Sequence, residues 1–208
     1  MLLADEFFLL AHDDTTGKSK LHARAIGLGL AGCLLGELLL HQRITIRDAE
    51  VLVLDRRPPP DALAHTVLDQ LIGESEHRAI RVWLAYLGQS AYGLVGERLA
   101  RSGVVRRQES RRLLRTTTTY IPMDINAAAW PAARLRSLFD HIEAMRLPDA
   151  VLLGLVSATG LARPLLWQAD SAIPKQLQRV IASLPPPMKE LVTHTEAAVG
   201  AATLSARQ

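Results

Sequence analysis

The sequence predicts a mainly α-helical protein that forms a single globular domain over residues 1–208, with one or two small β-hairpins. Hydrophobic residues make up 49% of the chain, enough for a sizeable core, and aromatic residues only 4%, so aliphatic side chains must form most of that core. The Gly/Leu-rich segment 25–40 places apolar residues on nearly every face of a helix, which is typical of a buried central helix. β-Branched residues cluster in two short stretches that favour hairpins.

The first half of the chain is expected to hold three helices and one hairpin. A short amphipathic helix is followed by an Asp-rich turn at residues 13–17, whose side chains can cap backbone groups. A Pro-rich linker, residues 56–60, separates the hairpin from a helix that Asp61 caps. The helices expected in this half are residues 5–12, 21–41 and 62–72, and the strands are residues 43–47 and 51–54.

Helical spacing of apolar residues continues through the second half, interrupted by a segment rich in Arg and Thr. That segment, residues 104–120, is expected to form a second hairpin with its turn at residues 108–110, and Gly103 is expected to end the helix before it. The helices expected here are residues 76–87, 91–102, 130–145, 147–159, 175–184 and 188–202. The large aromatic side chains expected to anchor the core are Trp83, Trp130 and Trp167.

The single cysteine, Cys33, excludes a disulfide or a cysteine-ligated metal site within one chain. It lies in an apolar run and is expected to be buried and unreactive. Residues 1–14 lack a basic segment and a cleavage site, so they do not resemble a signal peptide. The longest apolar run falls short of the ~20 residues of a membrane span. We therefore expect a cytoplasmic protein that meets a membrane only at its surface.

The sequence lacks the motifs of the common enzyme classes. It contains no phosphate-binding P-loop, dinucleotide fingerprint, nucleophile elbow or zinc-protease motif. Its seven His residues are scattered, and the His-Asp-Asp run at residues 12–14 is expected to end a helix with a capping turn rather than to bind a metal. An enzyme stays open as an alternative that no motif supports, and we expect no cofactor and no metal site.

Positive charge is concentrated in one segment. Residues 101–115 contain six Arg and one Glu, a net charge of +5, so the remainder sums to −2 within the total of +3. Local charge of this kind indicates a partner. An anionic membrane surface, where each nearby basic residue contributes ~1 kcal/mol, and DNA phosphates contacted by a wing-like hairpin are both candidates. The helices at 76–87 and 91–102 offer few basic residues to a DNA groove. The simplest alternative is a solvated hairpin whose arginines pair with acids elsewhere.

Three sequence blocks follow one another in an order found in a known family. The first, DEFFLLAHDDTTGK at residues 5–18, combines an acid pair, an apolar run and an Asp-rich turn. The second, GLAGCLLGELLLHQRI at residues 29–44, has a central Glu and ends in Arg-Ile. The third, GERLARSGVVRR at residues 96–107, runs into the basic hairpin and TTTTYIPMD. With the helix at 147–159 and the Gly-Leu after it, the blocks run through about three quarters of the chain and resemble the Golgi phosphoprotein 3 family, in its bacterial branch.

This resemblance implies a peripheral membrane adaptor rather than an enzyme. Eukaryotic members of the family bind phosphatidylinositol 4-phosphate in a basic pocket, recruit membrane enzymes by their cytosolic tails, and self-associate through the hairpin. When the first two blocks are aligned, the family's pocket tryptophan falls on His22 and a pocket arginine falls on Ala31. Arg24 lies close to the first of these positions. The candidates for the family's further pocket arginines are Arg134 and Arg136.

The leading hypothesis is therefore a peripheral adaptor on the inner face of the membrane that binds anionic phospholipid. The residues expected to bind the lipid or another anion are His22, Arg24, Arg134 and Arg136. The hairpin residues expected to contact the membrane or to mediate self-association are Arg106, Arg107, Arg111, Arg112 and Arg115. The expected partners are anionic phospholipid, cytosolic tails of membrane proteins and further copies of this chain through residues 104–120; nucleic acid is not expected. Two alternatives stay open: a winged-helix-like DNA-binding regulator with the hairpin as its wing, and a soluble oligomeric interaction scaffold.

Overall fold

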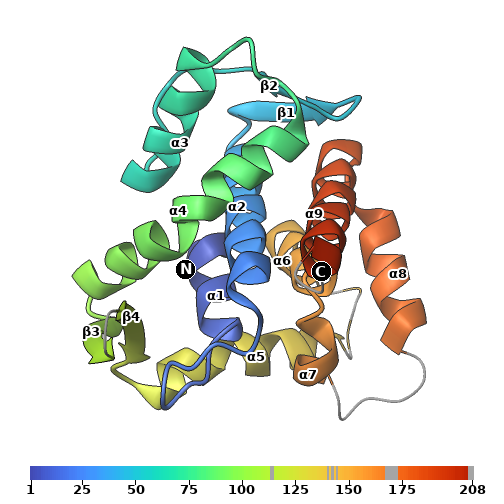
Figure 1. The fold of residues 1–208 in the computed structure, drawn as a ribbon. Coiled ribbons are helices and arrows are strands. Elements are labelled where there is room, and N and C mark those ends of the chain that lie inside the picture. Colours follow the sequence, from blue (N-terminus) through green and yellow to red (C-terminus); the bar gives the residue numbers. More distant parts are fainter. Residues whose placement is uncertain (113–114, 140, 142, 144, 167–172, 206–208) are drawn as a thin grey trace.

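The computed structural model describes residues 1–112, 115–139, 141, 143, 145–166 and 173–205, and it shows helices packed around a central helix with two small hairpins at the periphery (Figure 1). The helices are α1 (Leu3–Leu10), α2 (Ala23–Leu40), α3 (Ala62–Gly73), α4 (Ile80–Arg101), α5 (Ile125–Phe139), α6 (Leu147–Ala158), α7 (Ala162–Leu166), α8 (Ile173–Ser183) and α9 (Pro186–Ser205). The strands are β1 (Ile44–Arg47), β2 (Glu50–Val53), β3 (Val105–Arg112) and β4 (Arg115–Pro122). The predicted fold class is confirmed.

The central helix α2 is buried along almost its whole length, from Ala25 to Leu39, and packs against α1, α4, α6 and α9. It approaches α4 closely at Gly27, where a Cβ atom would lie 2.3 Å from the carbonyl oxygen of Gly88. With a mean hydropathy of 1.6 and 18 residues, α2 is long and apolar enough to cross a membrane, yet 78% of it is buried inside the protein, as expected for a core helix. The predicted buried helix is therefore confirmed.

A buried cluster of charged side chains joins the N-terminal helices. The guanidinium of Arg98 in α4 donates from Nε to Asp5 Oδ1 (2.9 Å) and from Nη1 to Asp61 Oδ2 (2.8 Å). Its Nη2 lies 3.6 Å from Glu37 Oε1, which also accepts the N–H of Ala4 (2.8 Å). Burial raises the pKa of Glu37 to about 7, because one guanidinium shared by three carboxylates only partly offsets the desolvation.

This cluster brings residues of the three sequence blocks together in space. Asp5 comes from the first block, Glu37 from the second and Arg98 from the third, and the cluster holds α1, α2 and α4 together. An isolated buried carboxylate is costly, so each of these residues depends on the others for its compensation.

The two hairpins are both antiparallel, as predicted, but the second has a different turn. In the first, Arg47 pairs with Glu50, so residues 48 and 49 form the turn between β1 and β2. In the second, Arg107 lies opposite Tyr120 and the ladder continues to residues 112 and 115. The turn predicted at residues 108–110 is therefore wrong. The buried Tyr120, whose hydroxyl donates to Glu97 Oε1 (3.1 Å), anchors β4 on α4 in this register.

Two helix predictions are corrected. Residues 76–87 and 91–102 were expected as separate helices, but α4 is continuous because Gly88, at the expected break, packs against α2. The helix expected at residues 130–145 begins earlier, at Ile125, since the Asp124 carboxylate accepts the N–H of Asn126 (2.8 Å) and so caps the helix there. The short helix α7 was not predicted.

Of the tryptophans expected to anchor the core, one is buried and one is exposed. Trp83 is buried, as predicted, and its indole N–H donates to the carbonyl oxygen of His77 (2.6 Å). Trp130 is 62% exposed on α5, so its prediction as a core residue is wrong. Trp167 lies outside the described residues.

Candidate functional site

A small cavity brings together two cationic side chains from distant parts of the sequence. The cavity lies between the end of α1, the following loop, α5 and α7, and has a volume of about 220 Å³. Lys20, Arg136 and Asp14 line it together with apolar side chains and the alanines of α5. Arg136 was predicted as an anion-binding residue, whereas Lys20 was not. Two cations and one carboxylate give the cavity a net positive charge.

The two cations are held so that part of their hydrogen-bonding capacity faces the cavity. The Nε–H of Arg136 donates to the carbonyl oxygen of Leu165 (2.8 Å), which fixes the guanidinium at α7 and leaves its Nη donors without a hydrogen bond to the described residues. Lys20 Nζ donates to the carbonyl oxygen of Leu10 (3.3 Å). Burial lowers the pKa of Lys20, and the positive charge of Arg136 lowers it further, whereas the negative charge of Asp14 raises it. Because the two cations repel each other, an anion bound between them would relieve this repulsion.

A capped turn positions the loop that carries the lysine. Asp13 Oδ1 accepts hydrogen bonds of 2.7–3.2 Å from the backbone N–H and hydroxyl groups of Thr15 and Thr16, which hold the pKa of Asp13 well below its usual range. Gly17 has a φ of +67°, and a Cβ atom there would lie 2.3 Å from the carbonyl oxygen of Tyr120 in β4. The predicted capping turn is confirmed, and it packs directly on the second hairpin.

His12, at the end of α1, is part of an aromatic cluster rather than of a polar site. Its ring stacks on Phe8 with the centroids 4.4 Å apart, and burial lowers its pKa. Within the part of the chain that the structure describes, no group of three His, Cys, Asp or Glu side chains lies close enough to hold a metal ion.

Arg134, another predicted anion-binding residue, is engaged inside the protein. Its two Nη nitrogens form ion pairs with Glu6 of α1 and Asp149 of α6, and its side chain is 24% exposed. Burial raises the pKa of Glu6, and the charge of Arg134 counteracts that shift. Arg134 therefore ties three helices together, and its charge is less available to an external phosphate than that of Arg136.

His22 and Arg24 lie at the start of α2. His22 is the N-cap residue, and its Nδ1 accepts the backbone N–H of Arg24 (3.3 Å). The Arg24 side chain lines a different groove, about 860 Å³ in volume, which also contains Arg81 and lies between α2, α4 and α9. Ala31, the position of a family pocket arginine, is fully buried. The four predicted anion-binding residues thus fall in three places, and Arg136 alone among them lines the cavity with Lys20.

The second hairpin carries partly neutralised charge. Arg107 pairs with Glu97 of α4 (3.0 Å), as the simplest alternative predicted, and also with Glu109 of its own strand (2.6 Å). Arg106 is exposed and forms no ion pair with the described residues. Arg111, Arg112 and Arg115 belong to the two strands, but their side chains lie outside the described part of the structure.

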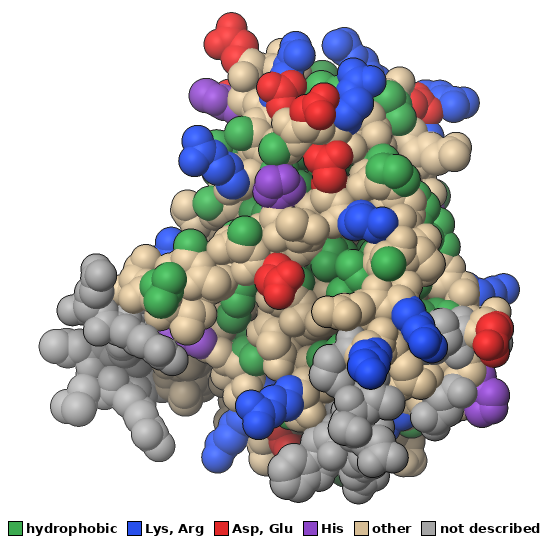
Figure 2. Space-filling model, turned by 90° about the vertical axis from the view of Figure 1, so that its right-hand side faces the viewer, with side chains coloured by type: hydrophobic (Ala, Val, Ile, Leu, Met, Phe, Trp, Pro, Cys, Tyr) green, Lys and Arg blue, Asp and Glu red, His purple; other side chains and the backbone are tan. Residues whose placement is uncertain are grey.

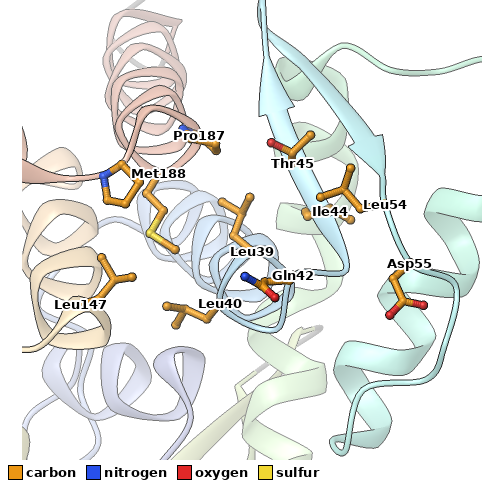
Figure 3. A pocket seen from close by; sticks show the side chains of 11 residues that line it. Leu39, Leu40, Gln42, Ile44, Thr45, Leu54, Asp55, Leu147, Pro187 and Met188 are labelled. Carbon is orange, nitrogen blue, oxygen red and sulfur yellow. The ribbon is translucent and has the colours of Figure 1, made fainter.

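An apolar pocket of about 530 Å³ lies at the other end of α2 (Figure 3). The side chains that line it come mainly from the end of α2, β1, the N-terminus of α6 and the start of α9, and include Leu39, Leu40, Ile44, Leu54, Leu147 and Met188. Its carboxylate, Asp55, pairs with Arg43 (2.7 Å) and Arg57 (2.8 Å). An 18-residue helix is about 27 Å long, so this pocket and the cationic cavity lie near opposite ends of α2.

The face of α8 and α9 carries mixed charge. Figure 2 shows this face with basic and acidic side chains interspersed and apolar side chains between them. Mixed charge of this kind is typical of an ordinary solvated surface and does not by itself indicate an anionic partner.

The fold and the site together define a mainly helical domain with a basic hairpin and a small cationic cavity at one end of its central helix. Comparison with protein families gives the particular family: the model of Golgi phosphoprotein 3 (GPP34) matches residues 3–198, and the chain belongs to this family. Membership indicates, at the level of the family, a lipid-binding adaptor of the Golgi phosphoprotein 3 type. No curated protein matches the chain significantly.

Proposed function

We propose that this protein is a peripheral membrane adaptor that binds the phosphate of an anionic phospholipid headgroup between Lys20 and Arg136. The observation that carries the proposal is their shared cavity, where a fixed guanidinium and a lysine ammonium line one small space. A guanidinium suits phosphate because its planar N–H groups match the phosphate oxygens, and a partly desolvated lysine adds a strong point charge. Family membership supports a lipid as the source of that phosphate.

The hairpin would supply a second, less specific attraction to the same membrane. It packs on the loop that carries Lys20 through Gly17 and Tyr120, so both features belong to one end of the molecule. Arg106 is exposed beside this contact, and residues 104–120 of the hairpin segment have a net charge of +4. Several weak contacts acting together give binding that falls steeply as salt screens them.

Self-association is proposed for the same hairpin. β3 and β4 form a two-stranded sheet with eight residues in each strand, so each strand has one edge that pairs with no other described strand. An unpaired edge of this length is a template for a strand from another copy.

An adaptor also needs a surface for the protein that it recruits. The apolar pocket of Figure 3 lies near the opposite end of α2 from the cationic cavity, so it would face away from a membrane bound at that cavity. We therefore propose that it receives apolar side chains from the cytosolic tail of a membrane protein.

The DNA-binding alternative has less support. A wing needs a neighbouring helix that presents basic side chains to the major groove. The helix before the hairpin, α4, packs along α2, and its Arg98 is held by the buried carboxylate cluster. Arg101 donates to the carbonyl oxygen of Glu97 on its own helix (3.3 Å).

The test is a vesicle titration of the double variant Lys20→Ala/Arg136→Ala. Phosphatidylcholine vesicles with and without phosphatidylinositol 4-phosphate serve as the probe, and soluble inositol 1,4-bisphosphate serves as a competitor. At ~1 kcal/mol for each cation, the variant should bind anionic vesicles about 30-fold more weakly, and the competitor should displace the wild-type protein. The matched control is Lys175→Ala/Arg179→Ala, which removes the same charges from exposed positions on α8. Equal losses in both variants would show that the cavity has no special role.

A further inference from the structure

Three large apolar side chains are exposed in one short stretch of chain. Met123, between β4 and α5, is 63% exposed, and Ile125 and Trp130 of α5 are 52% and 62% exposed. Burial of these side chains would be favourable, and single exposed apolar residues are common, but three within eight residues require an explanation. Packing on the core does not explain them, because α5 packs there through other residues, among them Pro131, Leu135 and Phe139.

The position of these residues on α5 places them beside the cationic cavity. Ala129 and Ala133 of α5 line that cavity. Residues three and four apart are neighbours on a helix surface, so Ile125 lies one turn before Ala129, and Trp130 lies beside Ala133. Trp130 and Ile125 therefore border the α5 wall of the cavity from two sides.

Cationic side chains lie in the cavity and on the hairpin next to this stretch of chain. Arg136 and Lys20 lie in the cavity itself. On the hairpin, Arg106 is paired in register with Ile121, and the N–H of Met123 donates to the carbonyl oxygen of Val104 (3.0 Å), which holds Met123 at the base of the same sheet. An exposed tryptophan with aliphatic neighbours and a basic surround is the composition of segments that lie at the boundary between lipid headgroups and acyl chains.

A bilayer fits this surface better than a protein partner does. The three side chains are each more than half exposed, so they project from the surface instead of lining a recess. A projecting apolar side chain is buried best by a deformable partner such as a bilayer. The indole in particular prefers a boundary where its ring contacts apolar groups and its N–H contacts water.

We propose that Trp130, with Met123 and Ile125, inserts into the headgroup–acyl boundary of the bilayer whose anionic headgroup occupies the adjacent cavity. This inference rests on the proposed function, since a headgroup bound in the cavity sets how these three side chains are oriented toward the bilayer. Segments of this kind sink about 5–10 Å into the boundary region. Removal of the indole should weaken vesicle binding about tenfold, because most of its surface would pass from water into the bilayer.

The experiment uses the full chain and vesicles of phosphatidylcholine and phosphatidylglycerol whose acyl chains carry bromine, which quenches tryptophan at short range. Wild-type protein is compared with Trp130→Phe, so that the difference in quenching reports on Trp130 without disturbing the buried Trp83. Trp130→Ala is then titrated with unlabelled vesicles. Leu54→Ala is the control, because Leu54 is also 62% exposed but lies at the apolar pocket near the other end of α2.

The expected result is strong quenching that Trp130→Phe loses, a roughly tenfold loss of affinity in Trp130→Ala, and no loss in Leu54→Ala. Salt-sensitive binding to anionic vesicles, with equal quenching of the wild type and of Trp130→Phe, would rule out insertion of Trp130 while leaving the proposed function in place. Absence of binding to any vesicle would overturn both.

Discussion

Replacement of Glu37 by Gln is expected to flatten the pH dependence of stability. In the folded protein, burial raises the pKa of Glu37 from 4.5 to about 7. The folded state therefore binds a proton more tightly than the unfolded state does, and Glu37 lowers the stability progressively as pH rises from about 4.5 to about 7. At 1.36 kcal/mol per pKa unit, the full effect is about 3 kcal/mol, of which about 2 to 3 kcal/mol falls between about pH 5 and about pH 8.

The assay is urea unfolding of the wild type and of Glu37→Gln at those two pH values. Gln mimics the protonated acid, and its oxygen can keep the hydrogen bond from the Ala4 N–H (2.8 Å), so the variant should lose stability less steeply. Glu6 and His12 also titrate with shifted pKa values, but they lie outside the carboxylate cluster around Arg98, so they contribute to both proteins and cancel in the comparison. The same difference in unfolding free energy between the two proteins at both pH values would instead show that Glu37 does not titrate between them.

Two further predictions concern packing and assembly. Gly27→Ala should destabilise the protein by roughly 1–3 kcal/mol in urea unfolding, since the added methyl would meet the Gly88 carbonyl oxygen at 2.3 Å. The control is Gly200→Ala in α9, where nothing lies within 4 Å of the added methyl, and it should stabilise the protein by about 0.5–1 kcal/mol. Similar effects of the two substitutions would contradict the close packing of α2 on α4 at Gly27. Replacement of residues 109–118 by Asn-Gly keeps the base of the second hairpin in register and shortens its edges, so light scattering should show a smaller assembly than the wild type; an unchanged mass would remove the hairpin from self-association.

Local patterns were sufficient for the elements whose sequence and packing agree. The apolar segment that became α2 could be predicted because apolar residues cover all of its faces, and the first hairpin because its β-branched residues flank a short polar turn. Prediction failed where a tertiary contact outweighed local propensity. Gly88 costs about 1 kcal/mol in a helix and looked like a break, but its contact with Gly27 keeps α4 continuous.

The site was only partly predictable for the same reason. Arg134 and Arg136 are two residues apart on one helix, and the local sequence does not show which of them is free to bind an anion. Glu6 and Asp149, which neutralise Arg134, come from two other helices, whereas Arg136 meets the cavity. Lys20 was missed because a lysine in a polar turn has no periodic or motif signal. The turn chemistry of Asp13 was recognised, but not the side chain that the turn would position.

The most direct test of the central claim is co-sedimentation of the wild-type protein with neutral and with anionic vesicles at low and at high salt. We expect binding to phosphatidylcholine vesicles that contain phosphatidylinositol 4-phosphate or phosphatidylglycerol, little binding to phosphatidylcholine alone, and a steep loss between about 0.05 M and about 0.5 M salt. Equal binding to neutral and anionic vesicles, or no binding to either, would contradict the central claim.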